Sequence, residues 1–66
     1  MCVRVNGVDV HLEGTSTLKS FIEREGYEIG RIAIEKNGEI VPRAQYETEL
    51  LDDDDHLEII TFVGGG

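Results

Sequence analysis

Apolar and polar residues alternate along the first twelve positions with the period of a β-strand. Val3 and Val5 flank Arg4. The same alternation resumes after a short break at Val8, Val10 and Leu12. A period of two predicts strands with one buried face. The break is Asn6-Gly7, the dipeptide that most readily supplies the two positive φ angles of a type I′ turn. The segment is therefore predicted to form a β-hairpin.

A change of period predicts one short helix after the hairpin. Apolar residues recur at the spacing i, i+3, i+4 in Leu18, Phe21 and Ile22. This spacing is typical of an amphipathic helix. Thr17 or Ser16 is the expected N-cap, and Gly26 is expected to end the helix as its C′ residue. A helix of about residues 18–25 is marginal in water by itself, so it must pack its apolar stripe on the sheet.

Alternation returns in the second half of the chain. Residues 31–36 predict a strand, Asn37-Gly38 a second type I′ turn, and residues 39–41 a short return strand. Pro42 ends that strand because proline cannot donate to a ladder. The last strand is expected within residues 56–63.

The segment between these strands has no clear period. Residues 44–51 are expected to form a loop or a single turn. Its expected apolar anchors are Tyr46, Leu50 and Leu51. The four consecutive aspartates of residues 52–55 predict a solvated turn, because Ca²⁺ loops space their ligands and turn at a glycine. No metal site is predicted, and His11, on the polar phase of its strand, is expected to be a surface residue.

The order of these elements, ββαβββ, predicts the α+β fold class. An initial hairpin excludes a simple βαβ repeat, and the last strand is expected inside the sheet beside the first. A mixed sheet of about four to five strands packed on one main helix is the β-grasp, or ubiquitin-like, arrangement. We expect residues 1–63 to form this domain and residues 64–66 a flexible tail.

Composition narrows the possible functions. A chain of 66 residues makes one small core and leaves no room for an ordinary catalytic cleft, which favours a binding or carrier role. The single cysteine, Cys2, excludes an internal disulfide and fits a reducing compartment. There is no signal peptide, and no apolar run approaches the ~20 residues needed to span a bilayer, so a cytoplasmic protein without a membrane partner is expected.

Charge is distributed unevenly along the chain. The net charge is −8, and residues 44–66 carry seven acidic side chains but no Lys or Arg. This balance disfavours nucleic-acid binding. It favours attraction toward a basic protein surface, or it serves solubility alone.

The sequence ends in Gly64, Gly65 and Gly66. Glycine has no Cβ, so such a tail is slim enough to thread a narrow channel. Three extended residues reach roughly 10 Å, which would carry the carboxylate of Gly66 into another protein's active site. The alternative is a frayed end without function.

The last strand has apolar residues on both faces. Leu57 and Ile59 share one phase, while Ile60 and Phe62 share the other. If the first pair faces the helix, the second lies on the open face beside the tail, where exposed apolar groups are typical of docking patches. The alternative is that they pack under the loop that contains Tyr46. The expected partner-binding residues are Ile60, Phe62 and Val63.

Several segments together match a known family. They are Asn6-Gly7, Gly14 with Thr17-Leu18, Ile32-Ala33-Ile34, Asn37-Gly38-Glu39-Ile40-Val41-Pro42-Arg43, Asp55 with Leu57-Glu58-Ile59, and Phe62-Val63-Gly64-Gly65-Gly66. With these segments the chain resembles the ThiS family, the sulfur carriers of thiamine biosynthesis. The Asn-Gly-Glu-x-Val-Pro-Arg segment is the most specific part. The chain departs from the family at Asp54, where Gly is common, and at Glu25, where an apolar residue is usual.

The resemblance implies a carrier rather than an enzyme. An ATP-dependent, ThiF/MoeB-like activating enzyme would adenylate the carboxylate of Gly66. A persulfide derived from a cysteine desulfurase would convert it to a thiocarboxylate, and a ThiG-like thiazole synthase would receive the sulfur. Gly64 and Gly65 would thread the partners' active sites. The chain would bind no cofactor, since ATP is used by the partner.

Other functions remain open at this point. The chain could serve molybdopterin, cysteine or methionine synthesis, or be a protein modifier joined to lysines. It could also be a β-grasp interaction module whose glycines do nothing. An enzyme would need a catalytic constellation, and the only candidate is Cys2 with His11 or His56, which their spacing does not bring together.

Overall fold

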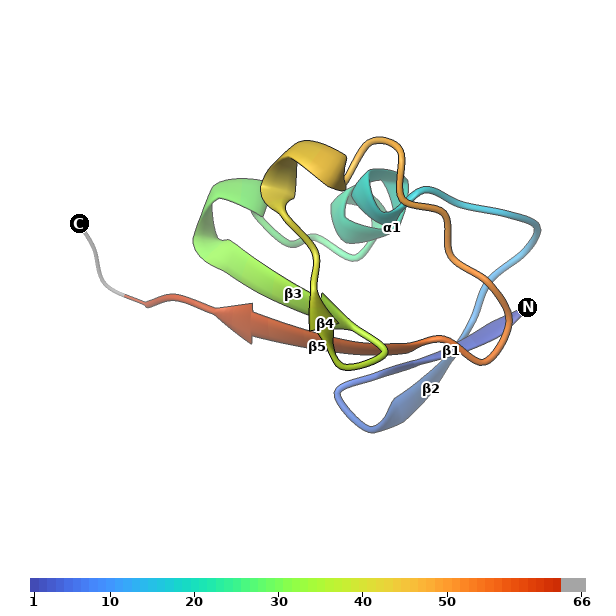
Figure 1. Ribbon diagram of the computed structural model, residues 1–66. Helices are drawn as coiled ribbons and strands as arrows, with labels where there is room; N and C mark the ends of the chain where they lie inside the picture. The colour runs from blue at the N-terminus through green and yellow to red at the C-terminus, as the bar shows by residue number, and fades with distance from the viewer. Residues whose placement is uncertain (64–66) are drawn as a thin grey trace.

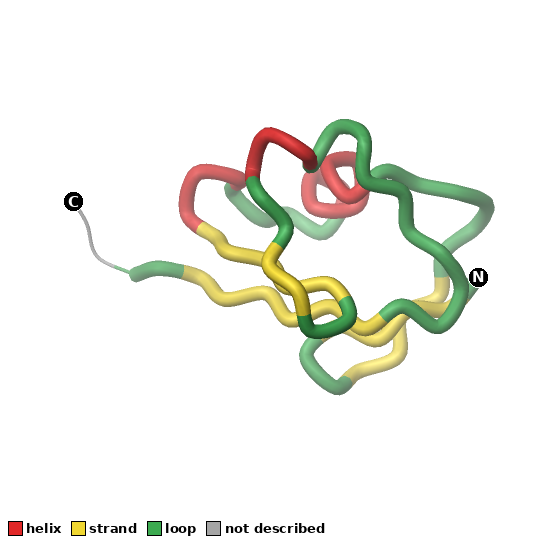
Figure 2. The backbone as a smooth tube through the Cα atoms, in the orientation of Figure 1, coloured by secondary structure: helices red, strands yellow, loops and turns green. Residues whose placement is uncertain are grey.

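The computed structural model describes residues 1–63, which form a five-stranded mixed sheet packed against one α-helix (Figure 1). The strands are β1 (Cys2–Val5), β2 (Val8–His11), β3 (Ile32–Lys36), β4 (Glu39–Ile40) and β5 (His56–Thr61). The helix and two 3₁₀ turns are α1 (Leu18–Arg24), η1 (Ile29–Arg31) and η2 (Arg43–Gln45). All three lie on the same side of the sheet (Figure 2). The predicted α+β, β-grasp architecture is confirmed.

Strand β5 occupies the middle of the sheet, whose order is β2-β1-β5-β3-β4. It pairs in parallel with β1, at Arg4↔His56 and Val5↔Leu57. On its other side it pairs antiparallel with the whole of β3. The predicted interior position beside the first strand is therefore confirmed. Since the β1–β2 hairpin turns back partway along β5, the end of β5 extends beyond it (Figure 1).

Both predicted hairpin turns are present with the expected backbone conformation. The φ angles are 50° at Asn6 and 83° at Gly7, and 53° at Asn37 and 87° at Gly38. Positive φ at both central residues is the requirement of a type I′ turn. The two turns fix the registers of β1–β2 and β3–β4, and thereby decide which side chains face the helix.

Helix α1 is held by the predicted caps. The Oγ1 of Thr17 accepts a hydrogen bond from the Ser20 N–H at 3.2 Å. At the other end Gly26 has a φ of 84°, and the Tyr27 N–H donates to the Ile22 carbonyl at 3.1 Å. These features define a Schellman motif, and the helix ends one residue earlier than predicted. In the described part of the chain no helix has the length and apolar character needed to cross a membrane.

The core lies between the sheet and the helical side. Its buried apolar side chains are Val3, Val5, Leu12, Leu18, Phe21, Ile22, Ile32, Ile34, Val41, Tyr46, Leu51, Leu57 and Ile59. The prediction that Leu50 is an apolar anchor is wrong, since its side chain is 54% exposed. Its backbone is what holds this segment, through an isolated β-bridge with Thr17 and a hydrogen bond from Lys36 Nζ to its carbonyl at 2.8 Å.

Candidate functional site

The end of β5 exposes apolar side chains on the face away from the helix. Ile60 and Phe62 are 52% and 55% exposed, whereas Leu57 and Ile59 are buried. The predicted division of the strand into two phases is therefore confirmed. The alternative, in which Ile60 and Phe62 pack under the loop around Tyr46, is wrong because Tyr46 belongs to the core on the opposite side of the sheet.

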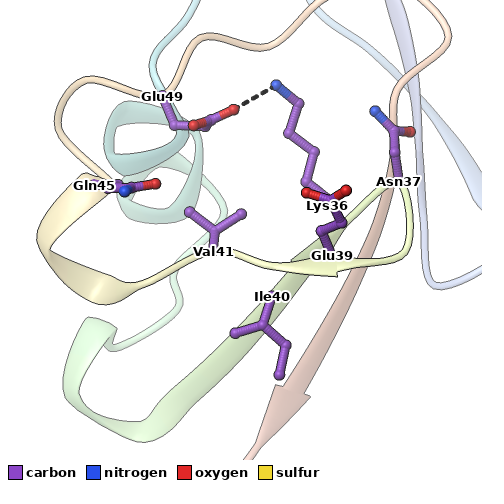
Figure 3. A pocket seen from close by; sticks show the side chains of 7 residues that line it. All are labelled: Lys36, Asn37, Glu39, Ile40, Val41, Gln45 and Glu49. Carbon is purple, nitrogen blue, oxygen red and sulfur yellow. Dashed lines mark hydrogen bonds and ion pairs between the residues drawn. The ribbon is translucent and has the colours of Figure 1, made fainter.

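Two further residues on this face were not predicted. Ala33 is the register partner of Ile60, and Ile40 is the exposed partner of Glu35. Figure 3 shows Ile40 pointing away from the buried side chain of Val41. We refer to Ala33, Ile40, Ile60 and Phe62 as the outer patch. The signal for these two residues is the strand register, which places Ala33 beside Ile60 and Ile40 beside Glu35.

The sheet also fixes where the chain leaves the domain. The Phe62 N–H donates to the Arg31 carbonyl at 2.7 Å, so the chain stays attached to the sheet one residue beyond β5. Val63 follows and is 94% exposed. The predicted tail residues Gly64, Gly65 and Gly66 lie outside the described residues, and their roles stay predictions. Ala33, Ile60 and Phe62 of the outer patch therefore lie at the same end of β5 as the point where the tail begins.

The aspartate turn is only partly solvated, which corrects the sequence interpretation. Asp55 is 7% exposed. Its carboxylate accepts hydrogen bonds from the Asn37 amide at 2.9 Å and from the Asp52 N–H at 2.7 Å, and Lys36 Nζ lies 3.6 Å away. Burial alone would raise the pKa of Asp55, but these partners outweigh it and lower the pKa. A buried carboxylate requires such partners, and here they anchor the start of β5.

Lys36 and Asn37 connect this carboxylate to the rest of the fold. Lys36 Nζ donates to a carboxylate oxygen of Glu49 at 2.8 Å (Figure 3), and this hydrogen bond raises the pKa of Lys36 despite its partial burial. Asn37 Oδ1 accepts from the His56 N–H at 2.9 Å. The shallow hollow drawn in Figure 3 is lined by Lys36, Asn37, Glu39, Ile40, Val41, Gln45 and Glu49. Within this hollow, Lys36 Nζ is bound by the carboxylates of Glu49 and Asp55, so the role of Lys36 is structural.

The cysteine and the histidines lie closer together than their sequence spacing indicates. Cys2 and His11 are direct partners in the β1–β2 register, and Cys2 and His56 line one hollow. Of the two aspartates that line that hollow, Asp9 and Asp54, Asp9 forms an ion pair with Arg4 at 3.1 Å. This group lies at the start of β5, about 20 Å from its other end at ~3.3 Å per residue. It is therefore remote from Phe62 and Val63, which follow the other end of the strand. Among residues 1–63 no cluster of ligand-type side chains could hold a metal ion.

The mixed sheet, the single helix and a central strand that leads from an apolar patch to a glycine tail define a β-grasp protein of the ubiquitin-like class. The sequence matches the model of the ThiS family over residues 3–66. The chain belongs to the ThiS family.

Individual relatives agree with this assignment. The sulfur carrier protein ThiS of Bacillus subtilis is 34% identical over 65 residues, which cover 97% of this chain and 98% of that protein. The crystal structure of the thiamine biosynthesis protein (ThiS) from Geobacter metallireducens superposes with a TM-score of 0.84 at 25% identity, with full coverage of both chains.

Two matches are to much longer proteins. A thiazole synthase of Paramagnetospirillum magneticum is 34% identical over 62 residues, which cover 94% of this chain. A thiazole synthase of Magnetococcus marinus is 32% identical over 66 residues. The chain spans only 19% and 20% of the lengths of these two proteins. In both, a segment similar to this chain accounts for about a fifth of the protein.

Proposed function

We propose that the chain is a sulfur carrier whose Gly66 carboxylate is converted to a thiocarboxylate and supplies sulfur for thiazole formation in thiamine synthesis. The observation that carries the proposal is the arrangement of β5. This strand lies between β1 and β3 in the middle of the sheet, exposes Ile60 and then Phe62 of the outer patch, and is followed in the sequence by the three glycines after Val63. Membership of the ThiS family and the similarity to the Bacillus subtilis sulfur carrier support it.

The proposed chemistry takes place on the tail and is catalysed by partners. A carboxylate is a poor electrophile, so the Gly66 carboxylate first attacks the α-phosphate of ATP in an activating enzyme of the ThiF/MoeB type, releasing pyrophosphate. The terminal sulfur of a protein persulfide, supplied by a cysteine desulfurase, then displaces AMP from the acyl-adenylate. A thiol cleaves the resulting acyl disulfide and leaves the thiocarboxylate. ATP is bound by the partner, and the carrier needs no cofactor of its own.

Each part of the chain has a separate task in this cycle. Gly64 and Gly65 admit the tail to a narrow channel, because a residue without a Cβ occupies the least width. The outer patch, together with Val63, docks the domain so that the tail enters in the correct direction. The network around Asp55 and Lys36 fixes β5 and hence the point from which the tail departs.

A thiazole synthase of the ThiG type is the proposed acceptor of the sulfur. The thiazole synthases of two bacteria match this chain over about a fifth of their own length. A carrier-like segment within the acceptor protein raises the local concentration of one partner around the other. We expect this chain to work in the same way with a thiazole synthase that is a separate protein.

Intact mass spectrometry tests the proposal. The purified chain is incubated with the activating enzyme, Mg-ATP and a persulfide source, and each component is omitted in turn as a control. The expected result is a mass increase equal to the exchange of one oxygen for sulfur, only in the complete mixture. A chain with one alanine added after Gly66 should gain no sulfur, since its carboxyl is displaced by roughly 3.5 Å. An unchanged mass in the complete mixture would overturn the proposal. Joining of the chain to lysines would instead support a protein modifier.

A further inference from the structure

Two glutamates face each other across the outer side of the sheet. Glu35 on β3 and Glu58 on β5 are direct partners in the antiparallel register. Both lie on the face away from the helix, because the residues on either side of them, such as Ile34 and Ile59, are buried on the helical side. Like charges directly opposite each other destabilise a sheet. The outer face of the sheet therefore carries an unfavourable pair of like charges between β3 and β5.

No cation of residues 1–63 forms an ion pair with either glutamate. Arg4, on the neighbouring strand β1, is bound by Asp9 at 3.1 Å. Lys36 lies on the opposite face and is bound by Glu49. The unfavourable pair is thus not offset by the domain's own basic side chains.

The acidic pair adjoins the outer patch. Ile40, on β4, is the register partner of Glu35. Ile60 follows Glu58 on the same face of β5. Both isoleucines are exposed. On its other side the pair borders a hollow that is lined by Asn37, Gly38, Asp54 and His56 as well as by the two glutamates. One continuous face of the sheet therefore combines exposed apolar side chains with two carboxylates.

We infer that this face docks a partner protein that places an arginine or lysine between Glu35 and Glu58, with apolar side chains beside it that cover the outer patch. The inference rests on the proposed carrier function and specifies the chemistry of the activating enzyme's docking surface. Charge complementarity identifies the occupant, because the chain has a net charge of −8 and its last 23 residues contain no Lys or Arg. An arginine fits best, since its planar guanidinium can bind two carboxylates at once.

Removing the charge of either glutamate should therefore change the stability of the domain and its affinity for the partner in opposite directions. In the free carrier, removing one negative charge relieves the repulsion and stabilises the sheet. In the complex, the same change removes one partner of the incoming cation and weakens the interface. A residue with a purely structural role would not separate the two quantities in this way.

The test uses Glu35→Gln and Glu58→Gln in the full chain, with Glu13→Gln as the matched control. Glu13 is exposed, lies in the loop after β2, and its substitution changes the net charge by the same amount. Thermal melts should give each outer-face variant a Tm equal to or above that of the wild type. Titration against the purified ThiF-type activating enzyme should show a Kd about fivefold higher for each of the two variants and unchanged for the control. Raising NaCl from about 50 to about 300 mM should weaken wild-type binding more than that of the variants.

The outcomes separate this inference from the proposed function. Equal affinity of Glu58→Gln and the wild type would overturn the docking inference, as would equal weakening by Glu13→Gln, which would indicate steering by net charge alone. In either case, a wild-type chain that still gains sulfur in the mass assay keeps its carrier function. A wild-type chain that neither binds the enzyme nor gains sulfur overturns both.

Discussion

The side-chain amide of Asn6 forms hydrogen bonds with both backbone polar groups of Ile59. Its Nδ2 donates to the Ile59 carbonyl at 3.1 Å, and its Oδ1 accepts from the Ile59 N–H at 2.7 Å. Strand β1 ends at Val5, so no backbone of β1 is available opposite this part of β5. The amide replaces the missing residue of the strand. A turn residue chosen for its positive φ thus also holds the strand that leads to the tail.

Replacing Asn6 with Gly should destabilise the domain by about 1–3 kcal/mol, because two partly buried backbone groups of Ile59 lose their partner. Glycine accepts the φ of 50° at this position, so the turn itself is preserved. Urea denaturation measures the loss in the free energy of unfolding, provided that the two proteins have the same m-value. The Asn6→Asp variant keeps the acceptor and loses the donor, and its stability should fall between the other two. Wild-type stability of Asn6→Gly would contradict the assigned role.

The carboxylate of Asp55 should make stability depend on acidic pH. Its pKa in the folded protein is lowered from the ordinary value of 3.8. A lowered folded pKa contributes stability that is fully present above the unfolded value and is lost as the pH falls through the folded value. The stability difference between wild type and Asp55→Asn should therefore be largest at neutral pH and shrink progressively below about pH 5. Unfolding free energies across this range measure it. The exposed Asp52→Asn serves as control, and an equal pH dependence of both variants would rule out the assignment.

The two faces of β5 should respond differently to substitution. Leu57→Ala or Ile59→Ala should destabilise by about 2–5 kcal/mol through cavity formation. Ile60→Asp or Phe62→Asp should cost less than about 1.5 kcal/mol, as expected for exposed positions. The same two aspartate variants should weaken binding to the activating enzyme by more than about 1 kcal/mol. Thermal melts and a binding titration decide this. If Ile60→Asp unfolds the protein as readily as Leu57→Ala, the outer patch is not a free surface.

Asp54 is the residue at which the chain departs from the family's usual glycine, and its backbone has a φ of 69°. A left-handed conformation is unfavourable for a residue with a Cβ. Asp54→Gly should consequently stabilise the domain by about 0.5 kcal/mol, the strain relief being partly offset by greater chain entropy in the unfolded state. Chemical denaturation measures the change. Asp52→Gly, at a position without positive φ, should destabilise instead. A loss of stability in Asp54→Gly would show that the aspartate is not strained.

The glycine tail should affect activation without affecting the fold. Gly65→Val should leave Tm nearly unchanged, because residues at a chain end contribute little to stability. Its adenylation should nevertheless fall sharply, since a branched side chain does not enter a channel shaped for glycine. Pyrophosphate release by the activating enzyme measures the rate, and Gly65→Ala, with a smaller side chain, should lie between. Full activity of Gly65→Val would remove the argument that the tail is threaded.

The local sequence was sufficient to predict the features that depend only on adjacent residues. The two Asn-Gly turns and the caps at Thr17 and Gly26 were predicted correctly because each depends on the dihedral angles and hydrogen bonds of adjacent residues. The alternation in β5 identified Ile60 and Phe62 as exposed for a similar reason.

Features that depend on distant partners were not predictable in this way. Four aspartates in a row are locally equivalent, and the contacts with Asn37 and Lys36, which come from another part of the chain, distinguish Asp55 from the others. Leu50 resembles a core residue in the sequence, but in the structure its backbone forms a β-bridge with Thr17 and its side chain is exposed. The pairing of Glu35 with Glu58 likewise requires the register of two strands that are far apart in the sequence.

The parallel pairing of β1 with β5 also determines how the domain bears mechanical load. The first strand begins at one end of the sheet, and the strand that carries the tail leaves at the other (Figure 1). Tension applied to the tail therefore acts along both strands, in shear, and loads the hydrogen bonds of the β1–β5 and β3–β5 ladders together rather than one after another. If a partner draws the tail into a channel, as the proposed function requires, its pull is opposed by both ladders at once. The domain can thus be held by its tail without being unravelled.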